Sequence, residues 1–178
     1  MTEYLAENRV LLDYLRDLKM PSVKEYIEDV EKQANAEQWS YRQFLSKLLE
    51  EEVHRRAENR KEQRIRQACF PEMKYLQELE REELPSEGRA VLPELETLNF
   101  IREGRNIVMY GNPGTGKTHI SIGLGMKACL EGYSVFFTTV PQMLTQIREA
   151  QSTRTLRKLQ HRFLMYDLVI CDEFGYVS

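Results

Sequence analysis

Apolar side chains recur at helical spacing through the first part of the chain, as at Val10, Tyr14 and Leu18. A second set with this spacing comprises Phe44, Leu45, Leu48, Leu49 and Val53. Residues 1–83 contain no glycine, prolines at positions 21 and 71 mark breaks, and Ser40 is placed to cap a helix that begins near Tyr41. We therefore predict an all-helical N-terminal domain over residues 1–84.

The pattern changes at residues 85–93, which begin and end with proline, contain glycine and so predict a linker. Beyond it, short apolar runs at 107–110, 134–139 and 168–171 predict strands, and helical patterns cover 119–131 and the residues from Pro141 onward. The first of these helices has two apolar faces, formed by Ile120, Leu124 and Ala128 and by Ile122, Met126 and Cys129. The alternation predicts an α/β core with a parallel sheet over residues 94–178.

Composition narrows the class of protein. The chain has 178 residues and a formal net charge of −3, which excludes a polybasic nucleic-acid tail and an acidic disordered one. Its start lacks a basic and then apolar signal segment, and no apolar run approaches the ~18 residues of a membrane span. We expect a cytoplasmic protein without membrane contact. The cysteines, Cys69, Cys129 and Cys171, lack metal or redox spacing and are predicted to be small core residues.

The stretch from Gly111 to Thr118 fits the pattern Gly-x-x-x-x-Gly-Lys-Thr, the Walker A motif, at every fixed position. A predicted strand precedes it and a predicted helix follows, as a phosphate-binding loop requires. Glycine lets backbone N–H groups approach phosphate oxygens because no Cβ intervenes, and the helix N-terminus adds partial positive charge. The sequence therefore predicts a nucleoside triphosphate site rather than a glycine-rich surface turn. The residues of this loop are Gly111, Asn112, Pro113, Gly114, Thr115, Gly116, Lys117 and Thr118.

Individual roles follow from the chemistry of the side chains. Lys117 is placed to contact the β- and γ-phosphates as a flexible cation, and the Thr118 hydroxyl is placed to ligate Mg²⁺. The apolar run 168–171 ends in Asp172 and Glu173, as in the Walker B motif, where a central parallel strand delivers acids to the carboxyl edge of a sheet. We expect Asp172 to hold Mg²⁺ through its water shell and Glu173 to orient or deprotonate the attacking water. Without the phosphate-binding loop, the simpler interpretation would be that the two acids mark the solvent-exposed end of a buried strand.

An arginine-rich segment covers residues 54–66, with Ala57 and Ile65 as almost its only apolar residues. A solvated helix is the default interpretation, stabilised by i,i+4 pairs such as Glu52 with Arg56, at about 0.2–0.5 kcal/mol each. The alternative is a contact to nucleic acid phosphates, because arginines 56, 60 and 64 fall on one stripe of such a helix.

Several stretches resemble a known family. In the N-terminal part these are residues 44–52, the arginines at 55 and 56, and residues 64–71, where an arginine-rich helix is followed by Ala-Cys-Phe-Pro. In the second part they are residues 98–101, the loop followed by His119, and residues 166–176, where Tyr-Asp precedes the strand and Gly-Tyr follows the acids. Together they resemble the IstB-like ATP-binding proteins, helper ATPases of an insertion-sequence transposase family that are similar to the DnaC helicase loaders.

The resemblance implies an AAA+ P-loop ATPase that assembles into oligomers on double-stranded DNA when ATP is bound, shapes or selects target DNA and stimulates a partner transposase. ATP and Mg²⁺ would be its cofactors, hydrolysis would reset assembly with Glu173 and Lys117 as catalytic residues, and His119 would join the nucleotide site. The DNA contacts implied are Arg55, Arg56, Arg60, Lys61, Arg64 and Arg66.

The family's core has further strands after the one that ends at Asp172 and Glu173, including a γ-phosphate sensor and an arginine that reaches a neighbouring subunit. We therefore expect a C-terminally incomplete, truncated sheet that binds ATP with little turnover alone. Two alternatives stay open: a replicative helicase loader of the same fold, and a truncated, non-catalytic module that binds DNA or a partner.

Overall fold

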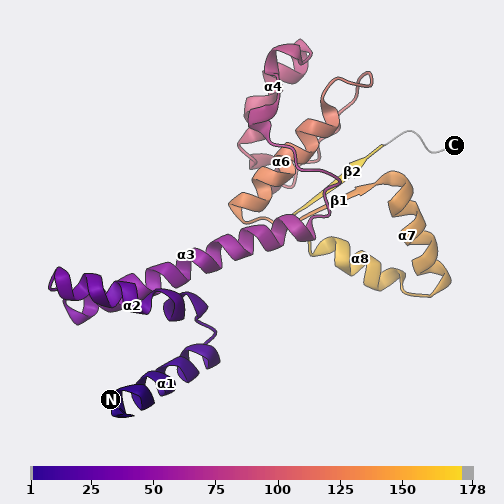
Figure 1. The fold of residues 1–178 in the computed structure, drawn as a ribbon. Helices are drawn as coiled ribbons and strands as arrows, with labels where there is room; N and C mark the ends of the chain where they lie inside the picture. Colours follow the sequence, from indigo (N-terminus) through magenta and orange to yellow (C-terminus); the bar gives the residue numbers. More distant parts are fainter. Residues whose placement is uncertain (1, 174–178) are drawn as a thin grey trace. The chain divides into compact units, whose positions relative to one another are not determined.

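The structure is a computed structural model that describes residues 2–173, with side chains described from residue 8 onward (Figure 1). Contacts divide the chain into two compact units, residues 1–60 and 61–178. The division falls inside a long helix, α3 (Tyr41–Gln67), whereas the sequence placed the boundary at residue 84. Residues 61–84 therefore pack with the part of the chain that carries the phosphate-binding pattern.

The first unit is helical in its described residues. It contains α1 (Thr2–Asp17), α2 (Pro21–Ala36) and the first part of α3. Its small core comprises Leu15, Val23, Val30 and Leu48, with Met20, Ile27, Trp39 and Phe44 packed against them. Pro21 begins α2, where its missing N–H costs nothing, and Ser40 caps α3 by accepting a hydrogen bond from Gln43 N–H at 3.3 Å. The predicted break at Pro21 and the predicted helix start after Ser40 are thus confirmed.

A buried carboxylate joins the helices of this unit. Glu52 lies on α3 with only 4% of its surface exposed. It accepts hydrogen bonds from the Ser22 backbone N–H at 2.9 Å and from Arg56 Nε at 2.8 Å. Because Ser22 lies in the first turn of α2, the carboxylate satisfies a helix N–H that has no partner within the helix.

The second unit is built around α6 (Lys117–Glu131), which is buried on two faces as its sequence predicts. One face, with Ile120, Leu124 and Ala128, joins a cluster that includes Leu92, while the other, with Ile122 and Met126, packs against Phe137 of β1. Strands β1 (Val135–Thr139) and β2 (Leu168–Asp172) pair in parallel, with Val135 opposite Leu168 and Thr139 opposite Asp172. The crossover between them consists of α7 (Val140–Ser152) and α8 (Leu156–Leu164), seen in orange and yellow in Figure 1.

The strand predicted at 107–110 is wrong. Across residues 2–173 the sheet has two strands, β1 and β2, instead of three. No backbone hydrogen bond joins residues 107–110 to another described segment, and the side chains of Val108 and Tyr110 are 81% and 87% exposed. An apolar, β-branched run forms a strand only beside a partner, and the described chain supplies none here.

The linker predicted at 85–93 is also wrong, because most of it lies in α4 (Ser86–Glu96). Leu92 is 1% exposed, and its burial outweighs the weak helix propensity of Gly88 and Pro93. Pro85 precedes the helix, where proline is tolerated. Three short helices flank α4 in the segment between α3 and α6. These are the 3₁₀ helices η1 (Leu76–Glu78) and η2 (Arg81–Glu83) and the helix α5 (Asn99–Arg102).

The cysteine prediction holds for one residue of three. Cys129 is buried in α6, and burial raises its pKa to about 11. Cys171 is exposed because its neighbour Ile170 packs towards α6 at Gly125, and strand alternation turns Cys171 to the opposite face. Cys69 is exposed in the turn after α3, where its φ is +60°. Within residues 2–173, no helix combines the length and apolar character needed to cross a membrane.

Candidate functional site

The predicted phosphate-binding loop runs directly into the N-terminus of α6. Its glycines adopt left-handed or related backbone angles, with φ of +143° at Gly111, +79° at Gly114 and +83° at Gly116. A Cβ on Gly116 would also lie 3.1 Å from Leu84 Cδ2. Glycine is therefore favoured at position 116 by the backbone angle, and the close approach of Leu84 adds to this preference.

Lys117 folds back across this loop. Its Nζ donates hydrogen bonds to the carbonyl oxygens of Gly111 at 2.9 Å and Asn112 at 2.7 Å, with Thr115 Oγ1 at 3.4 Å. The ammonium group is thus held against the first residues of the loop. A cation in this position complements the charge of a polyphosphate.

Thr118 and Asp172 meet although 54 residues separate them. The Thr118 hydroxyl donates to Asp172 Oδ2 at 2.9 Å, and the second oxygen, Oδ1, accepts the Glu173 backbone N–H at 2.9 Å. Glu173 has a φ of +60°, so the chain turns sharply as β2 ends. The hydroxyl and the carboxylate place two oxygen ligands side by side, which fits a hard cation such as Mg²⁺.

Metal binding at this point would need ligands from outside the protein. No group of three or more His, Cys, Asp or Glu side chains in the described part of the chain could hold a metal ion. Mg²⁺ in nucleotide sites is usually held by one or two protein oxygens together with phosphate and water oxygens. The Thr118 hydroxyl and the Asp172 carboxylate provide two protein oxygens of this kind.

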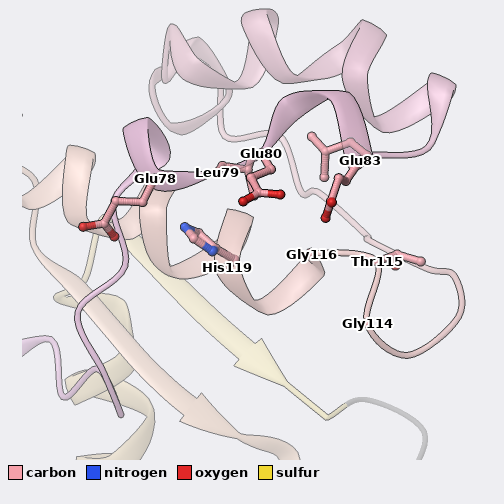
Figure 2. A pocket seen from close by; sticks show the side chains of 9 residues that line it. Glu78, Leu79, Glu80, Glu83, Gly114, Thr115, Gly116 and His119 are labelled. Carbon is pink, nitrogen blue, oxygen red and sulfur yellow. The ribbon is translucent and has the colours of Figure 1, made fainter.

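A cleft of about 320 Å³ adjoins the loop. One wall is formed by Gly114, Thr115, Gly116 and His119, and the other by residues 78–80, 83 and 84 (Figure 2). His119 Nε2 lies 2.9 Å from the carbonyl oxygen of Tyr75, which ties α6 to the start of the second wall. The family resemblance implied His119 at the site, whereas no pattern predicted the segment 75–84, because its leucines lie among glutamates and give only a weak signal of burial.

The arginine-rich segment lies on α3, as expected, but several of its cations have partners within the protein. Arg55 pairs with Glu25, Arg56 with Glu52 and with the Lys19 carbonyl oxygen at 2.8 Å, and Arg64 Nε donates to the Cys129 carbonyl oxygen at 2.8 Å. Lys61 also has a partner. Among residues with described side chains, Arg60 and Arg66 are exposed and make no hydrogen bond or ion pair.

A glycine-rich loop at the start of a buried helix, a lysine folded into it and a threonine–aspartate pair at the end of a parallel strand define the chain as a P-loop nucleotide-binding protein. Comparison with known families gives the more specific result. Residues 13–178 match the family described as IstB-like ATP binding protein, and the chain belongs to that family.

Individual relatives carry insertion-sequence names. The chain is 31% identical over 163 residues to the insertion sequence IS21 putative ATP-binding protein of Pseudomonas aeruginosa, covering 92% of the chain and 62% of the relative. It is 32% identical over 166 residues to the IS5376 protein of Geobacillus stearothermophilus, covering 93% and 66%. An IS21-like putative ATP-binding protein of Bacteroides fragilis (strain YCH46) is 26% identical, with 97% and 85% covered. The chain thus spans less than two thirds of the length of the first two relatives.

Proposed function

We propose that the chain binds ATP with Mg²⁺ and serves as the ATP-binding helper of a DNA transposition system. The main support for a nucleotide site is the hydrogen bond between Thr118 and Asp172, because it brings the end of the phosphate loop next to the end of β2. The insertion-sequence names of the relatives support the transposition role.

Each part of the site has a role in this proposal. The loop's N–H groups and Lys117 hold the β- and γ-phosphates, while Thr118 and Asp172 hold Mg²⁺, which supplies charge neutralisation at the phosphates when bound. His119 lies beside the loop in the cleft. Glu173, one residue beyond Asp172, orients or deprotonates the attacking water.

The wider role concerns the assembly. In our proposal the protein is of the AAA+ type, ATP binding drives its self-association on double-stranded DNA, and the assembly stimulates a partner transposase until hydrolysis resets it. The helical N-terminal part contributes DNA and partner contacts. Arg60 and Arg66 are the best placed of the α3 cations to contact phosphates, since they are exposed and carry no acid partner in the described structure.

Titration with a fluorescent ATP analogue tests the nucleotide site. Lys117→Ala should weaken binding at least about 10-fold, because it removes a charge-assisted hydrogen bond worth ~1.5–3 kcal/mol. Lys127→Ala is the matched control: it lies on the same helix, pairs with Glu131 at 3.7 Å and should leave the dissociation constant unchanged. Equal dissociation constants for Lys117→Ala and the parent chain would exclude this site.

A further inference from the structure

The cleft beside the phosphate loop has a wall that is fixed against α6 at two points. Leu76 packs so closely on Gly123 that an added Cβ there would lie 2.7 Å from Leu76 Cδ2, and Leu84 packs on Gly116 less tightly, with the corresponding distance 3.1 Å. The His119 contact with the Tyr75 carbonyl oxygen lies near the first of these points. The segment from Tyr75 to Leu84 therefore forms a built wall beside the loop, and the cleft lies between this wall and the loop.

The wall presents hydrogen-bond acceptors rather than cations. Figure 2 shows Glu80 and Glu83 directed towards the side of the cleft that carries His119 and Gly116. Glu78 also lines the cleft, but its carboxylate accepts the Tyr75 backbone N–H at 3.2 Å. The nearby arginines are engaged elsewhere: Arg81 pairs with Glu96, and Arg89 donates to the carbonyl oxygens of Glu82 and Leu84.

Such a wall suits the uncharged part of a nucleotide. Carboxylates repel phosphate groups, so Glu80 and Glu83 cannot extend the phosphate site. They accept hydrogen bonds from hydroxyl groups, and an acidic side chain on the ribose hydroxyls is a recurring solution in dinucleotide sites. The volume of about 320 Å³ falls at the lower end of the range for small-molecule sites, ~300–1,000 Å³.

We propose that this cleft holds the nucleoside part of the nucleotide, with the ribose hydroxyls donating hydrogen bonds to Glu80 and Glu83, so that the site selects ribonucleotides over 2′-deoxyribonucleotides. The inference rests on the proposed ATP binding and adds the part of the ligand that is recognised. Contact with the Glu80 carboxyl raises the pKa of Glu83. The two carboxyl groups therefore lie close to one another, as do the two ribose hydroxyls that would donate to them.

The test compares ATP with 2′-dATP by competition against the fluorescent analogue. Because a hydrogen bond to a charged acceptor is involved, the parent chain should prefer ATP by about 10-fold or more. In the double variant Glu80→Gln and Glu83→Gln the preference should fall to about 3-fold or less, through weaker ATP binding and not through tighter binding of 2′-dATP alone. Glu87→Gln, which changes an exposed acid of α4 outside the cleft, should keep the parental ratio.

The outcomes separate this inference from the proposal on which it rests. Equal affinity of the parent chain for ATP and 2′-dATP, with both weakened by Lys117→Ala, would overturn the ribose contact and leave ATP binding intact. A parental preference that survives in the double variant would overturn the assignment to Glu80 and Glu83. Failure of the parent chain to bind either nucleotide would overturn both. The ratio of ATP to 2′-dATP affinity is measured on the parent chain itself, so a folding defect in the double variant would still leave the ribose contact testable.

Discussion

The Thr118 hydroxyl donates a hydrogen bond of 2.9 Å to the Asp172 carboxylate, joining the first turn of α6 to the last residue of β2. The two residues come from the two separate sequence patterns that predicted the nucleotide site. Their contact places the two proposed metal ligands side by side.

Thr118→Val should weaken nucleotide binding in the presence of Mg²⁺ and have much less effect in its absence. Valine has a similar shape but no oxygen, so it removes one metal ligand together with the bond to Asp172. Thr118→Ser keeps the hydroxyl and serves as the control. Dissociation constants measured with excess Mg²⁺ and with a chelator decide the matter: an equal loss under both conditions would show that the hydroxyl acts without the metal.

Gly125→Ala should destabilise the second unit by about 1–3 kcal/mol, because overpacking a dense core forces neighbours to shift. An added Cβ would lie 2.7 Å from Ile170 Cδ1 and 2.8 Å from Phe70 Cε1.

Gly88→Ala should have the opposite effect on stability, since Gly88 lies in α4 and nothing lies within 4 Å of its added Cβ. That change should stabilise the protein by about 0.5–1 kcal/mol. Urea unfolding of both variants measures the difference, and two shifts of the same sign would contradict this account.

Glu52→Gln should lower stability at neutral pH by about 1–3 kcal/mol and flatten its dependence on acid. Burial raises the pKa of Glu52, but hydrogen bonds from Arg56 and from Ser22 outweigh burial and lower it overall. A carboxylate with a lowered folded pKa stabilises the fold above its unfolded pKa of about 4.3, and this contribution is lost as the pH falls through the folded pKa.

The measurement is urea unfolding at a series of pH values between roughly 3 and 7. The parent chain should lose the Glu52 contribution below about pH 4.3, and Glu52→Gln should lack that part of the slope. Glu28→Gln changes an exposed acid of α2 and should keep the parental profile. Identical acid profiles for Glu52→Gln and the parent chain would refute the role of the buried carboxylate.

Alkylation should distinguish the three cysteines. Cys69 and Cys171 are exposed and should be modified in the folded protein, whereas Cys129 should react only after unfolding. Partial burial of its sulfur raises the pKa of Cys171, and the deeper burial of Cys129 raises its pKa to about 11, so little of the reactive thiolate forms at Cys129 near neutral pH. Mass spectrometry after maleimide treatment, with and without denaturant, counts the labels. Rapid labelling of Cys129 in the native state would show that α6 opens readily.

The α3 arginines should separate into two groups in a DNA-binding assay. Arg60→Ala combined with Arg66→Ala should weaken binding to unrelated duplex sequences to a similar extent and reduce its salt dependence, with little effect on thermal stability. Arg56→Ala and Arg64→Ala should instead lower stability, because each breaks internal hydrogen bonds. Binding by the parent chain that is independent of salt between ~50 and ~200 mM would exclude phosphate contacts.

The helices and strands whose own apolar pattern shows how they must be buried could be predicted from the sequence. The double apolar face of α6 requires burial on two sides, and the uninterrupted apolar run of β2 requires a sheet, so both were found from the sequence alone. The loop glycines were predictable for a similar reason, since only glycine suits their backbone angles.

Features that depend on distant partners could not be predicted. Residues 107–110 have a strand composition but no partner in the described structure. Leu92 turns a proline-flanked stretch into α4 because the core needs its side chain. Glu80 and Glu83 reach the site only because Leu76 and Leu84 pack on glycines of α6 and its loop, a tertiary contact with no local pattern.

Lys117 donates hydrogen bonds to the Gly111 and Asn112 carbonyl oxygens, so on nucleotide binding its ammonium group would exchange these hydrogen bonds for bonds to phosphate. An incoming phosphate must compete with two neutral acceptors for one ammonium group, so the gain is the difference between the two sets of bonds. The same two bonds tie the ammonium to the start of the loop. Loss of the lysine would therefore remove contacts within the loop as well as a contact to phosphate, and the measured cost to affinity would include both effects.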